Sequence, residues 1–412
     1  MLWKGLITCT ICFLLLSEAG GQNNTSLHCG TDQLDAFFRQ NFPEYIQNRQ
    51  ELEINTLQVS NSVKSSFVLK IPVVVHVIYR LPEQNISNEQ IQSQIDVLNK
   101  DYNKNNWDTM LVPSVWKSLI ADCQIEFVLA NRDPQGNPHS GITRTQTTIA
   151  NIGVNGSDNH CLASKGGHDI WDRDSYLNIW VCELDNSLLG FAAFPGAPSY
   201  CDGVVISTYA FGTQGTAVDH NDKGRTTTHE VGHWLNLQHL WGNTTCGDDQ
   251  VSDTPIQEKA NFECPGFPHV TCNNGPNGDM FMNFMDWTYD ECMQMFTNGQ
   301  RDRMMTALNA SRSSLFNSNG YTGIDQPHSG MDIRVQPNPA GDFIDIYLSA
   351  ENKVKRVEIM DLNGKQIRDF GPSRTESPLH INTSGISSGM YILRVRTTDQ
   401  TAVSKIIIRE EG

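Results

Sequence analysis

The spacing of hydrophobic and polar positions changes several times along the chain. Residues 22–66 are polar, and loose helical spacing of apolar residues at 35–42 and 45–57 predicts two helices. These helices offer too little apolar surface for a core of their own, so we expect them to pack against another part of the chain. The nearly continuous apolar run of residues 68–79 then predicts a buried strand.

The middle of the chain mixes further strand and helix patterns. Residues 87–90 have the composition of a helix start, and Ile91, Ile95 and Leu98 continue it as an apolar stripe. Further strands are expected at residues 123–130, 176–184 and 203–207, and a closing helix at residues 299–315. We therefore predict an α+β domain over residues 67–318, loop-rich before its last helix.

The C-terminal part contains only short alternating segments. It follows residues 319–330, whose Ser, Asn, Gly and Pro are typical of a linker. Strands are expected at residues 344–348, 354–360, 366–370, 379–381, 390–396 and 403–408. Turn signals such as Asn363-Gly364 lie between them, so residues 331–412 predict a small all-β sandwich.

The strongest chemical signal lies within residues 228–239. His229 and His233 are four residues apart and face the same way on a helix, where two neutral imidazoles can share one zinc ion. Glu230 lies one residue round the helix, which suits a general base acting on a water molecule at the metal.

A third histidine, His239, comes six residues after His233, too far along a straight helix to reach the same ion. The chain must therefore turn, and Asn236 is the candidate because asparagine tolerates a left-handed backbone. An amphipathic helix with surface histidines explains the apolar residues here. It does not explain three histidines and a glutamate in so short a stretch.

Charge and the N-terminus indicate an exported protein. The formal charge of −16 over 412 residues disfavours nucleic acid and anionic membranes as partners. Residues 1–21 read as a signal peptide, with Lys4, an apolar run at 6–16 and small residues at 19–21. That run is too short to span a membrane, and no other segment approaches the length needed.

The chain has 11 cysteines, of which Cys9 and Cys12 fall in the signal peptide and Cys29 in residues 22–66. The eight that remain are Cys123, Cys161, Cys182, Cys201, Cys246, Cys264, Cys272 and Cys292. An even number in an exported chain predicts disulfides, although spacing does not assign the pairs. A thiolate zinc site is the alternative, but these eight include no Cys-x-x-Cys pair.

Residues 229–239 resemble the zinc signature of the metzincin metallopeptidases, in which glycine occupies the position of Asn236. Over residues 67–315 the chain most resembles the pappalysin family, of the ulilysin and cytophagalysin type. The resemblance implies that His229, His233 and His239 bind zinc and that Glu230 is the general base. Three protein ligands leave a fourth position open for water, as catalytic zinc requires.

The same resemblance assigns further residues after the zinc helix. Met285 would be the Met-turn residue, a hydrophobic floor below the metal. Trp287 stands where the family has an oxyanion-binding tyrosine; its indole N–H donates one hydrogen bond but does not titrate. Asp290 matches the acidic residue of the S1′ pocket, which implies cleavage before Arg or Lys.

Residues 247–255 concentrate oxygen ligands of the kind that calcium accepts. The resemblance implies a structural calcium site built from Asp249, the backbone of Ser252, and Thr254, with a plain acidic turn as the alternative. It also implies the disulfides Cys246–Cys272 and Cys264–Cys292, which would brace the loops around the cleft.

Residues 28–31 resemble the start of the family's propeptide, which we extend over residues 22–66 and call the prosegment. A thiolate is a strong zinc ligand, so we predict a cysteine switch in which Cys29 occupies the open zinc position of a zymogen. Residues 331–412 resemble a type IX secretion sorting domain, through segments such as 336–340, 359–364 and 388–391. This implies the type IX machinery as a partner, and a secreted or surface-attached protein.

The leading hypothesis is thus a secreted zinc endopeptidase that acts on proteins or peptides. One alternative is a surface adhesion protein with a weakened or vestigial metallopeptidase domain, for which Asn236 and Trp287 are the main support. Another is a zinc amidase that acts on a non-protein amide. The intact Glu230 favours an active enzyme, because loss of this base is the simplest route to inactivity.

Overall fold

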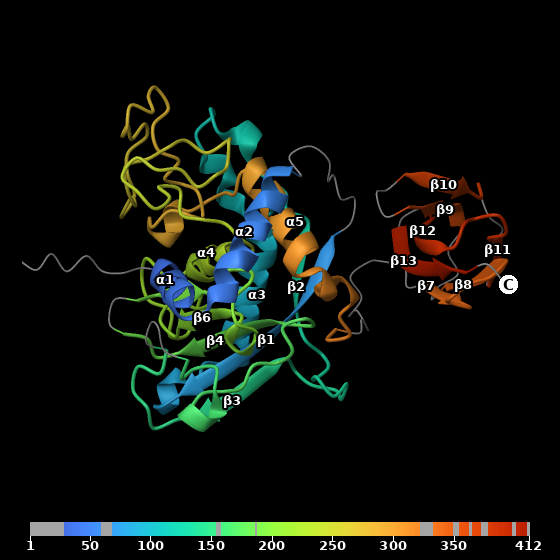
Figure 1. Cartoon of the computed structure of the whole chain (residues 1–412), viewed down its shortest axis with the longest axis horizontal. Coiled ribbons are helices and arrows are strands. Elements are labelled where there is room, and N and C mark those ends of the chain that lie inside the picture. Colours follow the sequence, from blue (N-terminus) through green and yellow to red (C-terminus); the bar gives the residue numbers. More distant parts are fainter. Residues whose placement is uncertain are drawn as a thin grey trace, which may run out of the picture.

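The computed structural model describes residues 29–58, 68–153, 158–185, 188–321, 333–348, 354–361, 365–371, 378–397 and 401–409. The expected signal peptide at residues 1–21 and most of the expected linker at residues 319–330 lie outside the described residues. Figure 1 follows the chain from the helical N-terminal segment through a mixed body of sheet and helices to a group of C-terminal strands.

A six-stranded sheet forms the centre of the larger body. Its strands are β1 (Leu69–Tyr79), β2 (Ile125–Leu129), β3 (Ile142–Gln146), β4 (Leu177–Cys182), β5 (Gly190–Ala192) and β6 (Val204–Ser207). The order is β2-β1-β4-β6-β5, with β3 also paired to β1. All neighbours are parallel except β5, which runs antiparallel to β6 at the edge.

Strand β1 is long enough to pair with two strands in succession on one side. Leu69 pairs with Ile125 of β2, and Val75, farther along, pairs with Ile142 of β3. Strands β3 and β5 were not expected from the sequence. Strand β5 is only Gly-Phe-Ala, and β3 has no fully buried position, so neither shows a hydrophobic pattern.

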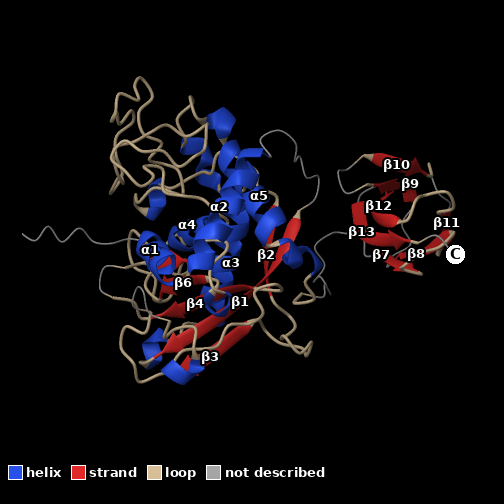
Figure 2. Cartoon of the chain, viewed as in Figure 1, coloured by secondary structure: helices blue, strands red, loops and turns tan. Residues whose placement is uncertain are grey.

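The helices gather on one side of the sheet in Figure 2. They are α3 (Asn88–Tyr102), α4 (Arg225–Trp234) and α5 (Asn298–Ser311). Ser87 caps α3 by accepting from the N–H of Gln90, and Thr297 caps α5 in a capping box with Gln300. The expected helix starts are therefore present at both places.

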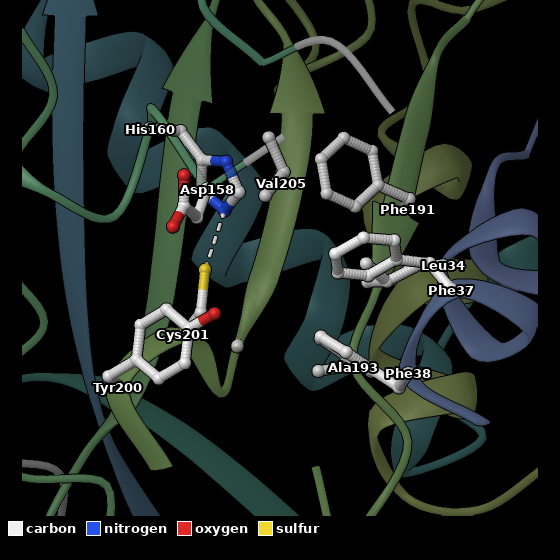
Figure 3. A pocket seen from close by; sticks show the side chains of 11 residues that line it. Leu34, Phe37, Phe38, Asp158, His160, Phe191, Ala193, Tyr200, Cys201 and Val205 are labelled. Carbon is white, nitrogen blue, oxygen red and sulfur yellow. Dashed lines mark hydrogen bonds between the residues drawn. The ribbon is translucent and has the colours of Figure 1, made fainter. Parts of the chain in front are cut away.

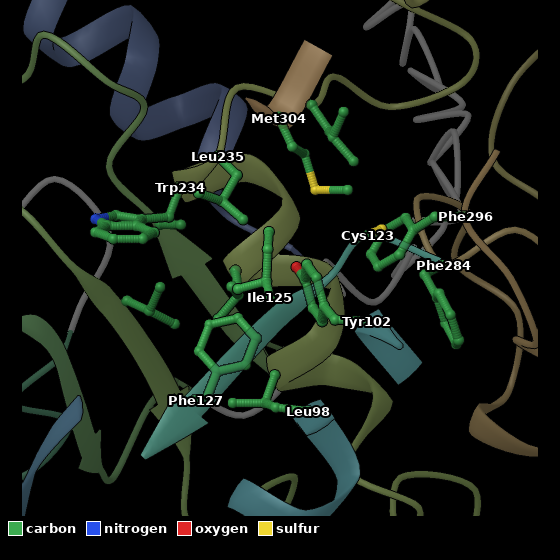
Figure 4. Close-up of a cluster of buried hydrophobic side chains, with 14 of the residues drawn as sticks. Leu98, Tyr102, Cys123, Ile125, Phe127, Trp234, Leu235, Phe284, Phe296 and Met304 are labelled. Carbon is green, nitrogen blue, oxygen red and sulfur yellow. The ribbon is translucent and has the colours of Figure 1, made fainter. Parts of the chain in front are cut away.

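Large apolar side chains fill the space between these helices and the sheet. Figure 4 shows Tyr102, Phe127 and Trp234 among them, and all three are buried. The Tyr102 ring meets the Phe127 ring edge-on at 5.0 Å, and its hydroxyl donates to the Thr228 carbonyl at 3.1 Å. This core thus fixes the start of α4, the helix that contains His229 and His233.

The prosegment forms α1 (Thr31–Asn41) and α2 (Pro43–Gln58). Helix α1 packs against β5 and α2 packs against α5. As expected from their small apolar surface, these helices join the core of the larger body: Leu34, Phe38 and Tyr45 are buried in one cluster with Trp180 and Phe191.

The region between α4 and α5 has little regular structure and is braced by two disulfides, Cys246–Cys272 and Cys264–Cys292. A third disulfide joins Cys161 to Cys201. The even cysteine count suggested that all eight would pair, but two of them do not. Cys123 and Cys182 are unpaired and buried, and burial raises the pKa of each thiol well above its usual value. They behave as small apolar core residues.

The C-terminal strands form two sheets around their own apolar core. The strands are β7 (Ile333–Gln336), β8 (Phe343–Leu348), β9 (Val354–Met360), β10 (Gln366–Asp369), β11 (Leu379–Asn382), β12 (Gly389–Thr397) and β13 (Thr401–Ile408). One sheet has the order β10-β9-β12-β13 and the other β11-β8-β7. The chain thus has the expected α+β body and all-β C-terminal part. Within the described residues, no helix is both long and apolar enough to cross a membrane.

Candidate active site

Three histidines meet at one point beside a pocket. The Nε2 atom of His233 lies 3.0 Å from that of His229 and 3.1 Å from that of His239, and the latter two are 3.3 Å apart. Two come from α4 and the third from the segment after it, and all three side chains are buried.

A sharp turn after α4 brings His239 to the other two. Asn236 has a φ of 78°, the left-handed conformation expected from the sequence. Its N–H bonds to the His233 carbonyl at 2.8 Å, and the N–H of Leu237 bonds to the Gly232 carbonyl at 2.9 Å. Arg303 of α5 donates to the Asn236 carbonyl at 2.7 Å and so fixes the turn from outside.

The opposite ring nitrogens show that this cluster suits a cation. Nδ1 of His229 faces the Phe284 carbonyl and Nδ1 of His233 faces the Leu237 carbonyl, each at 2.7 Å. Nδ1 of His239 lies 3.1 Å from a carboxylate oxygen of Asp32. Because these oxygens only accept, each Nδ1 holds the proton and the Nε2 lone pairs face one another. Three such lone pairs at roughly 3 Å fit the edges of a tetrahedral zinc site.

Glu230 lies beside this cluster and is fully buried. Its Oε2 accepts a hydrogen bond from the Thr31 hydroxyl at 2.9 Å, while Oε1 is buried without a partner among the described residues. Burial raises the pKa of the Glu230 carboxyl to about 8. A Cβ at Gly190 would come within 2.9 Å of the Glu230 side chain, so the edge strand needs glycine there.

Met285 packs directly under the zinc helix. A Cβ on Gly232 would meet the Met285 sulfur at 2.6 Å, so this glycine allows close contact between α4 and the turn below. The turn is fixed by Asn283, which accepts from the N–H of Met285 at 2.9 Å and exchanges hydrogen bonds with the Gln300 amide.

Aromatic residues surround His239. The indole N–H of Trp287 points at the Nε2 of His239 from 3.2 Å, so it lies beside the point where the three histidines meet. The ring of Trp241 stacks on His239 with centroids 4.5 Å apart. The sequence singled out Trp287 but gave no reason to notice Trp241.

A pocket opens beside His229 and Glu230 and contains the side chain of Asp290. Asp290 is buried, and its Oδ2 accepts from the N–H groups of Lys223 and Arg225 at 2.9 and 3.2 Å, at the start of α4. Burial raises the pKa of Asp290 to about 6, against the lowering effect of these N–H groups.

The prosegment reaches the same pocket, which Cys29 helps to line. The Cys29 sulfur is 3.5 Å from Nε2 of His233, and all four ligand atoms of Cys29 and the histidines lie within 4.8 Å of one another. The N–H of Gly30 bonds to the Gly190 carbonyl at 2.9 Å, and the Thr31 hydroxyl accepts from the N–H of Ala192 at 2.9 Å.

Behind the zinc site, α2 contacts the turn after α4. The guanidinium of Arg49 bonds to the Asn236 side chain and lies 4.5 Å from the centroid of the Phe194 ring. Glu53 accepts from Arg303 at 2.6 Å. The sequence did not indicate these contacts, because nothing in the pattern of α2 shows which charged residue becomes buried.

Helix α1 also covers a small pocket over the sheet (Figure 3). Leu34, Phe37 and Phe38 lie together with Phe191 on one side of it. On the other side of the pocket, Cys201 of the Cys161–Cys201 disulfide lies 3.3 Å from Nε2 of His160. The prosegment therefore covers apolar surface as well as the metal ligands.

In the predicted calcium loop, Asp249 is buried although its neighbours are exposed. Its Oδ1 accepts from the N–H of Val251 at 3.1 Å and from the Thr254 hydroxyl at 2.6 Å. Its Oδ2 is buried without a hydrogen-bond partner among the described residues, and burial raises its pKa to about 7. A buried carboxylate oxygen with no protein partner is a group that suits calcium binding.

The sequence is similar to those of known protein families and known proteins. Residues 163–309 match the M43 peptidase family described as pregnancy-associated plasma protein-A, and residues 334–409 match the secretion system C-terminal sorting domain. An extracellular metalloprotease of Arthroderma benhamiae is 32% identical over 243 residues, 56% of this chain and 68% of the relative. One from Neurospora crassa is 29% identical over 323 residues, 73% of this chain and 97% of the relative.

Two solved structures from Tannerella forsythia resemble the larger body. A promirolysin variant is 42% identical with a TM-score of 0.64, over 70% of this chain and 97% of that one. Mature mirolysin, in complex with a cleaved peptide, is 46% identical with a TM-score of 0.59, over 61% of this chain and 96% of that one. These matches confirm both resemblances drawn from the sequence. The chain therefore belongs to the pappalysin family of zinc metalloendopeptidases, and its C-terminal sorting domain marks it for secretion or surface attachment.

Proposed function

We propose that this chain is the zymogen of a secreted endopeptidase that cleaves peptide bonds before Arg or Lys. The main support is the meeting of three histidine Nε2 atoms, 3.0–3.3 Å apart, beside a buried glutamate and a pocket that contains Asp290. His229, His233 and His239 would hold the zinc ion, which when bound acidifies the attacking water and polarises the scissile carbonyl.

Glu230 would be the general base. Its carboxylate lies one residue from His229 on α4 and is bound by the Thr31 hydroxyl in the intact chain, so release of the prosegment would free it to take a proton. It would take one proton from the water and then deliver it to the leaving amine. The Trp287 indole, 3.2 Å from His239, would donate a hydrogen bond to the developing oxyanion.

Asp290 would choose the residue after the cleaved bond. Its Oδ2 accepts hydrogen bonds from two backbone N–H groups at the start of α4. Its Oδ1 accepts none from the described residues. A guanidinium or ammonium group of the substrate would pair with it in the pocket. The peptide complex of mature mirolysin is consistent with peptide binding in this family.

The prosegment would keep the enzyme latent in two ways. Cys29 would occupy the position that water needs at the metal, and Thr31 already binds Glu230 and the edge strand. The anchor formed by Arg49, Glu53, Asn236 and Arg303 would hold the prosegment in place. A cut between α2 and β1 would release it, and a relative known as promirolysin supports the zymogen assignment.

We propose two further roles, one for the loop that contains Asp249 and one for the C-terminal domain. Asp249, the backbone of Ser252, and Thr254 would bind a structural calcium ion, supported by the unsatisfied Oδ2 of Asp249. Residues 331–412 would direct the chain to the type IX secretion machinery, supported by the sorting-domain match.

The proposal is tested on the full chain after limited proteolysis, with zinc and calcium present. A peptide library is digested and the cut sites are read by mass spectrometry, beside a Glu230→Ala chain treated in the same way. We expect cuts before Arg or Lys, and a loss of about 10³-fold in the variant with one zinc still bound. A preference for other residues after the cleaved bond would contradict the role of Asp290. A Glu230→Ala chain that cleaves at the normal rate would contradict the role of Glu230.

A further inference from the structure

A buried group of charges lies behind Asp290, outside the residues assigned so far. Arg225 is the first residue of α4 and its side chain is buried. Its Nε lies 3.1 Å from Oδ2 of Asp101, its Nη2 lies 3.0 Å from Oδ2 of Asp108, and its Nη1 donates to the Met293 carbonyl. The guanidinium of Arg225 is therefore within ion-pair distance of two carboxylates, although its Nε has no hydrogen-bond partner among the described residues.

Asp290 contacts the same residue only through the backbone. The N–H of Arg225 donates to Oδ2 of Asp290 at 3.2 Å, while the Arg225 side chain is turned to the other two carboxylates. Two carboxylates thus pair with one buried guanidinium, and Asp290 adds a third carboxyl group close by, so acidic groups outnumber the one buried cation next to the pocket. A buried group of one sign attracts an opposite charge from outside.

The two partners of Arg225 are themselves fixed. Asp101 accepts from the Thr228 hydroxyl at 2.7 Å, and Asp108 accepts from the Asn106 amide at 2.5 Å. They come from α3 and from the turn that follows it, not from the cleft. Neither touches the histidines, so no role in the chemical step follows from their position.

We propose that Asp101 and Asp108 are positioning residues for substrate specificity: they hold the Arg225 guanidinium away from Asp290 and so leave Asp290 free to bind a basic side chain. The proposal rests on the function proposed above, in which Asp290 selects Arg or Lys. Without these carboxylates, Arg225 would be able to pair with Asp290 or repel the incoming cation. The enzyme would then lose its preference while its zinc chemistry stayed intact.

The test compares two peptides that differ only after the cleaved bond, one with Arg and one with Met, at pH 8. This pH lies above the pKa of Asp101, which burial raises to about 7. For Asp108→Asn and Asp101→Asn we expect KM for the Arg peptide to rise about tenfold, the size of effect that one charge at this depth supplies. The kcat values for both peptides and the KM for the Met peptide should stay within about twofold. The variants would lose only an interaction with the Arg side chain that is equally strong in the ground state and the transition state.

Asp96→Asn is the matched control, since Asp96 lies on α3 with the same charge but is exposed. Arg225→Gln is the second variant, and with the cation gone the Arg preference should be kept or increased. An unchanged preference in both Asn variants would overturn the inference, as would an equal fall in kcat for both peptides. If the unaltered enzyme itself shows no preference for Arg, the proposed role of Asp290 fails first, so the two failures are distinguishable.

Discussion

The hydroxyl of Thr31 donates a hydrogen bond to Oε2 of Glu230 at 2.9 Å, which joins the prosegment to the proposed general base. The hydroxyl oxygen of Thr31 also accepts from the N–H of Ala192 in edge strand β5. The Thr31 side chain therefore forms hydrogen bonds both to the proposed base and to the strand beside it. The proposed latency would therefore depend on Thr31 as well as on the Cys29 thiol.

Replacing Thr31 with valine in the full chain keeps the shape of the side chain and removes both hydrogen bonds. We expect docking of the prosegment to weaken by about 1–3 kcal/mol, because buried partners are left unsatisfied. Unprocessed protein should then cleave a reporter peptide faster and mature sooner. Thr56→Val is the control, since among the described residues the Thr56 hydroxyl bonds within its own helix, to the Leu52 carbonyl. Equal latency in both variants would contradict the role of Thr31.

Arg49→Ala removes the anchor at Asn236. The arginine is buried at 4% exposure, so we expect its loss to cost about 2–3 kcal/mol of docking free energy. After the chain is cut between α2 and β1, the prosegment should leave the enzyme during size-exclusion chromatography, whereas it should co-elute in the unaltered protein. Arg39→Ala, at an exposed arginine paired with Asp35, is the comparison. Co-elution in both variants would show that the anchor contributes little.

Specificity should depend on pH through Asp290. Burial raises its pKa to about 6, so the carboxylate that binds a basic side chain is present above pH 6 and is lost as the pH falls through 6. The ratio of kcat/KM for an Arg peptide to that for a Met peptide should therefore fall by about tenfold for each unit below that value. The Met peptide cancels effects at the zinc and at Glu230. A constant ratio between pH 5 and 8 would exclude Asp290 as the selecting group.

Asp249→Asn tests the calcium loop. Calcium at about 100 times its Kd should stabilise the unaltered chain by about 2.7 kcal/mol, and the variant should lose this gain. Thermal unfolding with and without calcium measures the difference. Asp248→Asn, at the exposed neighbour, should keep most of the gain. A calcium response that survives in Asp249→Asn would assign the ion to another place.

The zinc cluster could be predicted because its geometry is local. His229 and His233 share a helical face, and the left-handed turn falls at Asn236, a residue type that tolerates this conformation. The main strands also showed clearly, because β1 and β4 are buried along most of their length.

The contacts that were missed join residues far apart in sequence. Arg49 and Asn236 are 187 residues apart, and Arg225 and Asp108 are 117 apart, so no periodicity connects them. Strand β5 is too short for a pattern, although it is the strand that meets the prosegment. The free thiols Cys123 and Cys182 were missed because a count of cysteines says nothing about where each side chain lies.

The six-stranded sheet is built only from residues between Leu69 and Ser207. Within the described residues the prosegment adds a single isolated bridge, Cys29 to Gly190, and the C-terminal strands pair only among themselves. Trimming at either end therefore leaves every ladder of the central sheet closed. If the prosegment and the sorting domain are removed as proposed, the hydrogen-bonded scaffold beneath the histidines would therefore stay in place.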